Sequence, residues 1–211
     1  IYGDWTRPNL AGWKSVLLAN AITPVQQYSY TTGKNATDSA MIIDAMDILY
    51  TDQVNGFCLV SSDSDFTKLA VRLREAGMMV YGLGEKKTPE PFIVACDKFI
   101  YLEILGEESD DDKPDPKGPK DKAKRRQTFD KVTRKVIKLL ENTISDAADE
   151  DGWAFLGDVG TLLLKKQPNF DPRNFGYQKL TPFLNSIDKF EIEQRSSHKG
   201  RFKLIYVRNK E

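Results

Sequence analysis

Two aspartates separated by a single serine, Asp63 and Asp65, are the residues of this chain best placed to do chemistry. They follow the apolar run 56–60, which has the pattern of a buried strand, and precede 67–73, which has that of an amphipathic helix. In an open parallel α/β sheet, ligands bind at this carboxyl end of the strands. Like charges a few ångströms apart repel by roughly 3 kcal/mol at an effective dielectric near 20. Such a pair usually holds a cation, shares a proton or faces a helix N-terminus.

A third carboxylate, Asp38, opens a predicted helix that follows another strand of the same sheet. Because the carboxyl ends of parallel strands share one edge, Asp38, Asp63 and Asp65 are expected to converge there. Three carboxylates form a hard, oxygen-rich site that suits Mg²⁺ or Mn²⁺ rather than zinc. Two such ions, or one ion with a water, could hold a phosphodiester and activate the attacking hydroxide.

Each acid also has an ordinary structural interpretation. Asp38 lies in a first helical turn, where it complements the helix dipole, with Asn35 or Thr37 as the cap. Asp63 could simply cap the helix that follows it. The metal-site hypothesis therefore depends on the conjunction of the three acids. Asp4, near the end of the first predicted strand, is a further candidate for the same edge.

Polar residues beside these acids are candidate phosphate contacts. Lys34 and Asn35 directly precede the acidic helix, and Ser61 and Ser62 directly precede the aspartate pair. The first two have helix capping as their alternative role, and the serines have close packing at a strand end. The sequence leaves both interpretations open.

Composition narrows the possible chemistry. The chain has 211 residues and 40% apolar content, and no apolar run approaches the roughly 18 residues of a membrane span. The single histidine, His198, nearly excludes histidine-dependent triads and Cys/His metal centres, so hydrolysis would have to use carboxylates. Cys58 and Cys96 lie in apolar contexts that predict buried thiols in a reducing compartment, and no signal peptide is visible. We therefore expect a cytoplasmic protein.

Residues 1–105 alternate between segments with the sequence pattern of a strand and segments with that of a helix. Strands are predicted over 1–5, 25–31, 57–61, 78–83 and 99–105, and helices over 8–21, 38–50, 66–76 and 91–96. Repeated β-α-β units predict an α/β fold, in which a parallel sheet carries helices on both faces.

The remainder of the chain has a different organisation. Residues 106–128 are dominated by charge, proline and glycine, which predicts a flexible linker. The second domain, 129–211, is predicted to contain three helices over 129–143, 158–166 and 174–187, then a β-hairpin over 190–195 and 201–208. Three helices followed by a hairpin is the order of a small α+β winged-helix domain.

Charge is unevenly divided between the two domains. Residues 1–105 hold nine Lys and Arg against twelve Asp and Glu, whereas 129–211 hold fifteen against twelve. The second domain also carries a basic, aromatic-bearing cluster that fits nucleic-acid contact: Lys165, Lys166, Arg173, Tyr177 and Lys179. A protein-interaction face with ordinary solubilising charges is the alternative.

Longer runs of sequence resemble two known families. Residues 30–47, 57–66 and 80–92 resemble the NYN domain, a member of the PIN-like metal-dependent nucleases. Residues 152–160, 170–180 and 190–192 resemble the LOTUS (OST-HTH) domain. Together the two resemblances cover nearly everything except the linker.

The NYN resemblance implies a PIN-like fold and Mg²⁺- or Mn²⁺-dependent ribonuclease activity, with metal ligands at positions that match Asp38, Asp63 and Asp65. The LOTUS resemblance implies a winged helix that binds single-stranded or structured RNA, or a protein partner. NYN domains normally have a further first strand that ends in an aspartate, before the segment with which this chain begins. The abrupt start at 1–4 favours loss of that strand from the sequence.

Two alternatives to a ribonuclease remain at this point. If the natural protein lacks the strand, the domain would bind metal weakly or be inactive, and the chain would be an adaptor that binds RNA or protein. A carboxylate-metal phosphatase would use the same acids without needing the basic domain. The RNA target, the number of ions and the oligomeric state are not determined by the sequence.

Overall fold

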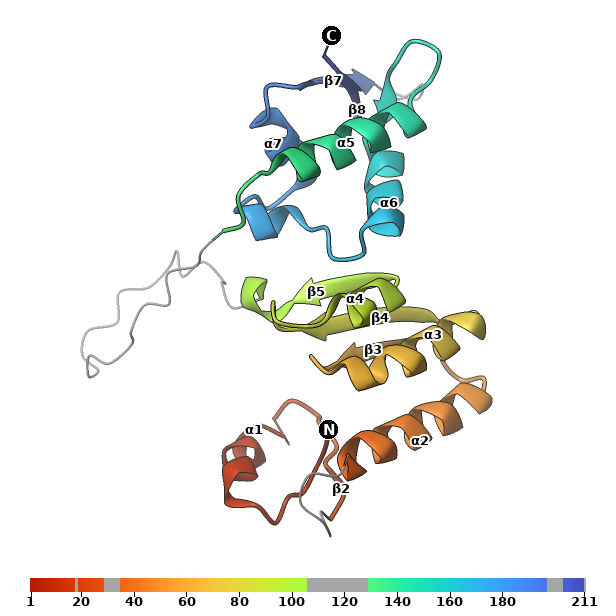
Figure 1. Ribbon diagram of the computed structural model, residues 1–211, viewed down its shortest axis with the longest axis vertical. Helices are drawn as coiled ribbons and strands as arrows, with labels where there is room; N and C mark the ends of the chain where they lie inside the picture. The colour runs from red at the N-terminus through yellow and green to blue at the C-terminus, as the bar shows by residue number, and fades with distance from the viewer. Residues whose placement is uncertain (18, 29–34, 106–128, 197–202, 211) are drawn as a thin grey trace, which may run out of the picture.

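The computed structural model describes residues 1–17, 19–28, 35–105, 129–196 and 203–210. Two domains lie one above the other in Figure 1, and one edge of the first domain's sheet is turned toward the second domain. Lys34, the predicted linker 106–128 and the hairpin turn with His198 lie outside the described residues.

The N-terminal segment forms a small parallel pair of strands. β1 (Tyr2–Gly3) pairs with β2 (Val25–Gln26), and a 3-10 helix, η1 (Pro8–Trp13), and the short α1 (Lys14–Leu17) lie between them. The continuous helix predicted over 8–21 is therefore wrong. The 3-10 helix ends at Trp13 and the α-helix begins at Lys14. Gly12, a poor helix former, lies beside this change.

The main sheet is parallel and has the strand order β3-β4-β5. Its elements are α2 (Ala36–Tyr50), β3 (Gly56–Val60), η2 (Ser64–Phe66), α3 (Thr67–Glu75), β4 (Met79–Gly84), α4 (Glu90–Ala95), β5 (Lys98–Tyr101) and η3 (Leu102–Ile104). The predicted α/β fold with a helix-flanked parallel sheet is confirmed.

One face of this sheet forms the core of the first domain. Leu59, Val80 and Phe99 point into it from the three strands, and Leu73 and Phe92 meet them from α3 and α4. The opposite face is open, since Val60 and Met79 are 61% and 47% exposed. The sequence predicted helices on both faces of this sheet. In the part of the chain that the structure describes, helices cover one face only.

The second domain packs three helices against an antiparallel sheet. Its elements are α5 (Arg134–Ala147), β6 (Ala154–Phe155), α6 (Leu156–Lys166), η4 (Pro172–Phe175), α7 (Leu180–Asn185), β7 (Phe190–Ser196) and β8 (Lys203–Asn209). β7 and β8 pair as the predicted hairpin, and β6 adds a third strand beside β8 that the sequence did not predict.

Two predicted helices of this domain differ from the observed ones. α5 begins at Arg134 rather than at Phe129, because the Thr133 hydroxyl accepts a hydrogen bond from the Val136 backbone N–H and caps the helix there. The helix predicted over 174–187 is interrupted at Gly176, whose φ of 85° lies in the left-handed region that favours glycine. The chain therefore forms η4 and α7 instead of one helix.

The edge strand β5 is the part of the sheet nearest the second domain (Figure 1). The Phe99 backbone N–H donates to the Pro168 carbonyl over 2.9 Å, and the Asn169 amide donates to the Tyr101 hydroxyl over 2.7 Å. These contacts pair part of the exposed strand edge and hold the two domains together.

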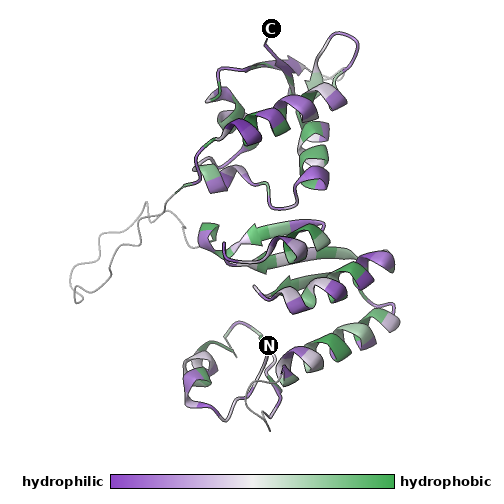
Figure 2. Ribbon diagram, in the orientation of Figure 1, coloured by the Kyte–Doolittle hydropathy of each residue, from purple (hydrophilic) through white to green (hydrophobic). Residues whose placement is uncertain are grey.

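Hydrophobic residues concentrate where the elements pack. Figure 2 shows β4 and β5 as largely hydrophobic, whereas the last turn of α6 is hydrophilic. Among the residues described, no helix combines the length and apolar content needed to cross a bilayer.

Candidate metal centre

Three carboxylates from separate parts of the chain meet at the carboxyl edge of the sheet. Asp38, Asp63 and Asp65 each offer one oxygen, and these three oxygens lie within 4.8 Å of one another. Asp38 comes from the first turn of α2, and the other two flank the start of η2, directly after β3. The three acids converge as predicted. The expectation that each follows a strand of one sheet is wrong for Asp38, because β2, the strand before α2, pairs with β1 in a separate two-stranded sheet.

The donor set fits a hard divalent cation. Two oxygens on opposite sides of a Mg²⁺ ion lie about 4.2 Å apart, since each ligand is about 2.1 Å from the ion. The separation of at most 4.8 Å is within reach of small side-chain adjustments. Asp63 and Asp65 are exposed and Asp38 is half-buried, so a substrate can approach.

The cluster brings three acidic groups close together. Burial raises the pKa of the Asp38 carboxyl above its ordinary value, and the charges of Asp63 and Asp65 raise it further. Ionisation of Asp38 is therefore less favourable than that of an ordinary aspartate. A bound cation would reverse this effect, because an opposite charge favours the ionised carboxylate.

The backbone after β3 fixes the aspartate pair. Asp63 accepts a hydrogen bond from the Asp65 backbone N–H over 2.9 Å, so it caps η2 as its structural interpretation predicts. The Ser61 hydroxyl in turn accepts from the Asp63 backbone N–H over 3.1 Å. Because a carboxylate has two oxygens, one can cap the turn while the other faces a ligand.

Asn35 connects α2 to this turn. It occupies the N-cap position of α2, yet its side chain makes no capping hydrogen bond. Its amide instead donates to Asp65 over 2.5 Å. The capping role considered for the Asn35 side chain is therefore wrong, and the residue positions a carboxylate of the cluster.

The ends of β3 and β4 are tied together beside the acids. The Ser62 hydroxyl accepts from the Glu85 backbone N–H over 2.8 Å. A Cβ on Gly84 would lie 2.5 Å from the Ser61 carbonyl oxygen, so only glycine allows this close approach. These contacts give Ser61 and Ser62 structural roles at the edge that carries the acids.

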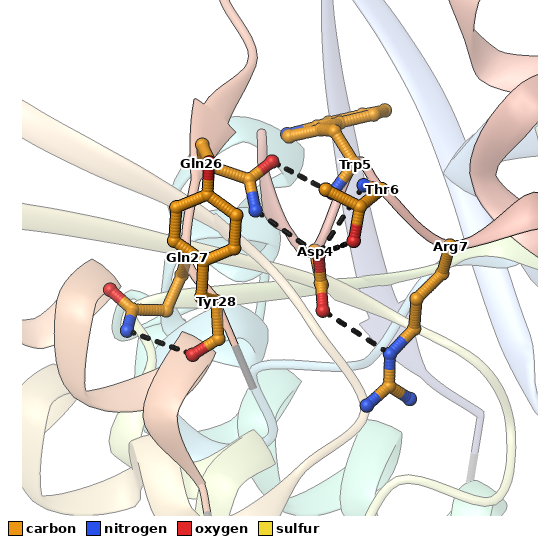
Figure 3. Close-up of polar contacts among 7 residues, drawn as sticks. All are labelled: Asp4, Trp5, Thr6, Arg7, Gln26, Gln27 and Tyr28. Carbon is orange, nitrogen blue, oxygen red and sulfur yellow. Dashed lines mark hydrogen bonds and ion pairs between the residues drawn. The ribbon is translucent and has the colours of Figure 1, made fainter. Parts of the chain in front are cut away.

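Asp4 is held in a separate polar network (Figure 3). Its carboxylate accepts hydrogen bonds from the Thr6 hydroxyl at 2.6 Å and the Gln26 amide at 3.1 Å, and it pairs with Arg7 at 3.4 Å. It does not belong to the group of three carboxylates that lie within 4.8 Å of one another. Asp4 therefore joins the loop after β1 to β2.

The basic cluster predicted in the second domain divides into two groups. Lys165, Arg173 and Lys179 line adjoining hollows at the domain junction. Lys166 pairs instead with Asp146 over 2.5 Å, on the side that faces α5, and Tyr177 packs against Phe183.

Two lysines of the first domain were not singled out from the sequence. Lys86 follows β4 at the acidic edge and pairs with Asp130 of the second domain over 2.9 Å. Lys98, the first residue of β5, lines the hollows at the domain junction. The position of Lys86 at the acidic edge could have been predicted, because it closely follows a predicted strand. The position of Lys98 at the junction could not, because it depends on how the domains dock.

Comparisons with known proteins identify both halves. Residues 1–103 match the family model of the NYN domain, and residues 127–202 match that of the OST-HTH/LOTUS domain. A solution NMR structure of an uncharacterized protein from Nitrosomonas europaea is 28% identical, with a TM-score of 0.36, and the match covers 46% of this chain and 92% of that one. No curated protein gave a significant match.

Proposed function

Because this chain belongs to the NYN family in its first half and carries an OST-HTH/LOTUS domain in its second, we propose that it is a metal-dependent ribonuclease. Its substrate would be RNA, and it would hydrolyse phosphodiester bonds at the carboxyl edge of the NYN sheet. The observation that carries this proposal is the convergence of Asp38, Asp63 and Asp65 within 4.8 Å.

The three aspartates are proposed as the metal ligands and catalytic residues, with Mg²⁺ or Mn²⁺ as the cofactor. A divalent cation held there would activate a water molecule and offset the charge that develops on the phosphate. Asn35 would keep the Asp65 carboxylate oriented through its 2.5 Å hydrogen bond. Ser61 and Ser62 would hold the two strand ends at a fixed spacing, which keeps the acids in place.

Substrate binding is proposed for basic and polar residues of both domains. In the sequence of the NYN domain these are Lys34, Asn35, Ser61 and Ser62, and in the LOTUS domain they are Lys165, Lys166, Arg173, Tyr177 and Lys179. The exposed lysines among them suit phosphate contacts, which carry most of the affinity for a nucleic-acid backbone. The LOTUS domain would thus recruit RNA, and binding assays distinguish this role from recruitment of a protein partner.

The test uses labelled single-stranded RNA and Mn²⁺ with the full chain and with an Asp63→Asn/Asp65→Asn variant. We expect cleavage by the unchanged protein and at least a hundredfold slower cleavage by the variant. Cleavage that survives both substitutions would contradict the assignment of the site. RNA binding without cleavage by either protein would identify the chain as an adaptor, and release of phosphate from small phosphomonoesters would identify a phosphatase.

A further inference from the structure

The geometry points to a path for single-stranded RNA along the junction of the two domains, which we call the junction groove. Two adjoining hollows form it, and both are lined by Lys98 and Thr161. This inference rests on the proposed function for the cutting step, since it states where the same RNA is held. It adds the NYN domain's own β5 to the RNA-binding surface.

The junction groove has an excess of positive charge. Five basic side chains and two acidic ones line it: Arg74, Lys98, Lys165, Arg173, Lys179, Asp97 and Asp171. Asp97 pairs with Arg74 over 3.0 Å, and Asp171 pairs with Arg173 over 2.7 Å.

The two pairs leave three lysines with uncompensated charge. In the described ranges, Lys98, Lys165 and Lys179 have no carboxylate within ion-pair distance, while the whole chain has a formal net charge of zero. Lys98 also acts across the junction. Burial alone would raise the pKa of Asp171, but the hydrogen bonds and charge of Arg173 lower it, and Lys98 lowers it further. The three lysines therefore make a local cationic track that spans both domains.

An aromatic ring lies beside this track. Tyr81, on the open face of β4, is 41% exposed and lines the same hollow as Lys98 and Lys165. Lysines along a groove with an exposed aromatic side chain are the combination by which proteins hold single strands, because phosphates meet cations and a base stacks on the ring. An acidic peptide would use the lysines without needing the ring. The groove therefore fits single-stranded RNA better.

The walls of the junction groove are held in place. The hydrogen bonds from Phe99 to Pro168 and from Asn169 to Tyr101 join β5 to the loop after α6. On the α6 side, Gly157 and Gly160 line the groove without side chains. A bound strand would therefore meet a preformed channel, which limits the ordering cost of binding.

The groove and the acids lie at opposite ends of the strands. Met79, the first residue of β4, lines the groove, whereas Asp63 and Asp65 follow the far end of the neighbouring β3. Six residues of strand span about 20 Å at about 3.3 Å per residue. RNA that occupies both places must therefore be several nucleotides long, so very short oligonucleotides would bind weakly and be poor substrates.

Binding is tested separately from cleavage, with metal-free protein in EDTA and a labelled single-stranded RNA of twenty nucleotides or so. A Lys98→Gln/Lys165→Gln variant is compared with Lys135→Gln/Lys189→Gln, which removes the same charge at exposed lysines outside the groove. We expect the groove variant to bind at least tenfold more weakly. Its slope of log affinity against log salt should fall by about 1.4, at about 0.7 per lost phosphate contact. Tyr81→Leu should weaken binding at least fivefold with little change in slope.

Equal losses in the two double variants, or no loss in the groove variant, would overturn the inference. Displacement of RNA by polyglutamate as effective as that by unlabelled RNA would overturn the choice of RNA over an acidic protein. Cleavage measured in parallel separates the two proposals. Groove-dependent binding without cleavage would contradict only the ribonuclease, and cleavage with an unchanged KM in the groove variant would contradict only the groove.

Discussion

The side-chain amide of Asn35 donates a 2.5 Å hydrogen bond to the carboxylate of Asp65, thirty residues away in sequence. The bond ties the start of α2 to the turn after β3, and both segments supply carboxylates to the candidate metal centre. It gives Asp65 a defined orientation that exposed aspartates seldom have.

Asn35→Ala should therefore weaken metal binding and RNA cleavage without unfolding the domain. Partners that orient metal ligands are typically worth about 10- to 100-fold in affinity or activity. Ser39→Ala is the matched control, because the Ser39 hydroxyl donates to the Asn35 backbone carbonyl in the same helical turn. If both substitutions reduced the rate equally, the effect would come from the helix and not from Asp65.

Asp38→Asn should have opposite effects on the metal-free and metal-bound protein. The folded-state pKa of Asp38 is raised, so the ionised group costs stability as pH rises above 3.8. At pH 7 in EDTA we expect the variant to match the unchanged chain or exceed it by up to about 1 kcal/mol, the range for exposed charges.

With Mn²⁺ at a hundred times its Kd, the unchanged chain should gain about 2.7 kcal/mol, and Asp38→Asn should gain much less. Denaturant unfolding with and without Mn²⁺ measures both effects. A full Mn²⁺ gain in the variant would mean that Asp38 is not a ligand.

Metal binding should also release protons in the acidic range just above pH 3.8, where part of Asp38 is protonated. Calorimetric titration with Mn²⁺ in two buffers of different ionisation enthalpy counts these protons. We expect a release that fades as pH approaches 7. Proton uptake, or a release that grows toward pH 7, would be incompatible with a raised Asp38 pKa.

Asp171 should stabilise the LOTUS domain in a pH-dependent manner. Its pKa is lowered, because the bonds from Arg173 outweigh the effect of burial, and it caps η4 through the Arg173 backbone N–H. The contribution is present above pH 3.8 and is lost as pH falls through the lower folded-state value. Asp171→Asn should cost about 2 kcal/mol at pH 7.

Unfolding at pH 7 and at pH 3 measures this contribution, and the cost of Asp171→Asn should shrink at the lower pH. Asp188→Asn is the control, since its carboxylate pairs with Lys210 but is fully exposed and should matter far less. Equal costs for the two substitutions would contradict the role given to Asp171.

The contact between Asn169 and Tyr101 should couple the two domains. Their 2.7 Å hydrogen bond joins β5 to the loop after α6. In a double-mutant cycle of Asn169→Ala and Tyr101→Phe, we expect a coupling energy of about 1 kcal/mol in the free energy of unfolding. Strictly additive effects would show that the domains do not dock through this bond in solution.

The meeting of the three acids could be predicted from sequence because Asp63 and Asp65 follow a strand directly and Asp38 opens the helix before that strand. The apolar run 56–60 placed the strand before Asp63 and Asp65. The sequence did not show that the strand before Asp38 lies in a different sheet, because β2 is only two residues long and pairs with β1. Asn35 was misjudged because its local position favours capping, whereas its partner is thirty residues away.

The errors in the helices arose from local backbone effects. Gly176 takes a positive φ that stops the predicted third helix of the LOTUS domain, and Gly12 lies where the predicted first helix of the NYN domain breaks. The junction groove could not be predicted, because Lys98 and Lys165 lie in different domains and approach each other only through docking. The predicted linker 106–128 stays a prediction.

Calorimetric titration of Mn²⁺ into metal-free protein at pH 7, beside the Asp63→Asn/Asp65→Asn variant, tests the metal centre most directly. We expect saturable binding by the unchanged chain and loss of at least a hundredfold in affinity in the variant. Equal Mn²⁺ affinity of the two proteins, or no saturable binding by the unchanged chain, would contradict a metal centre built from these three carboxylates.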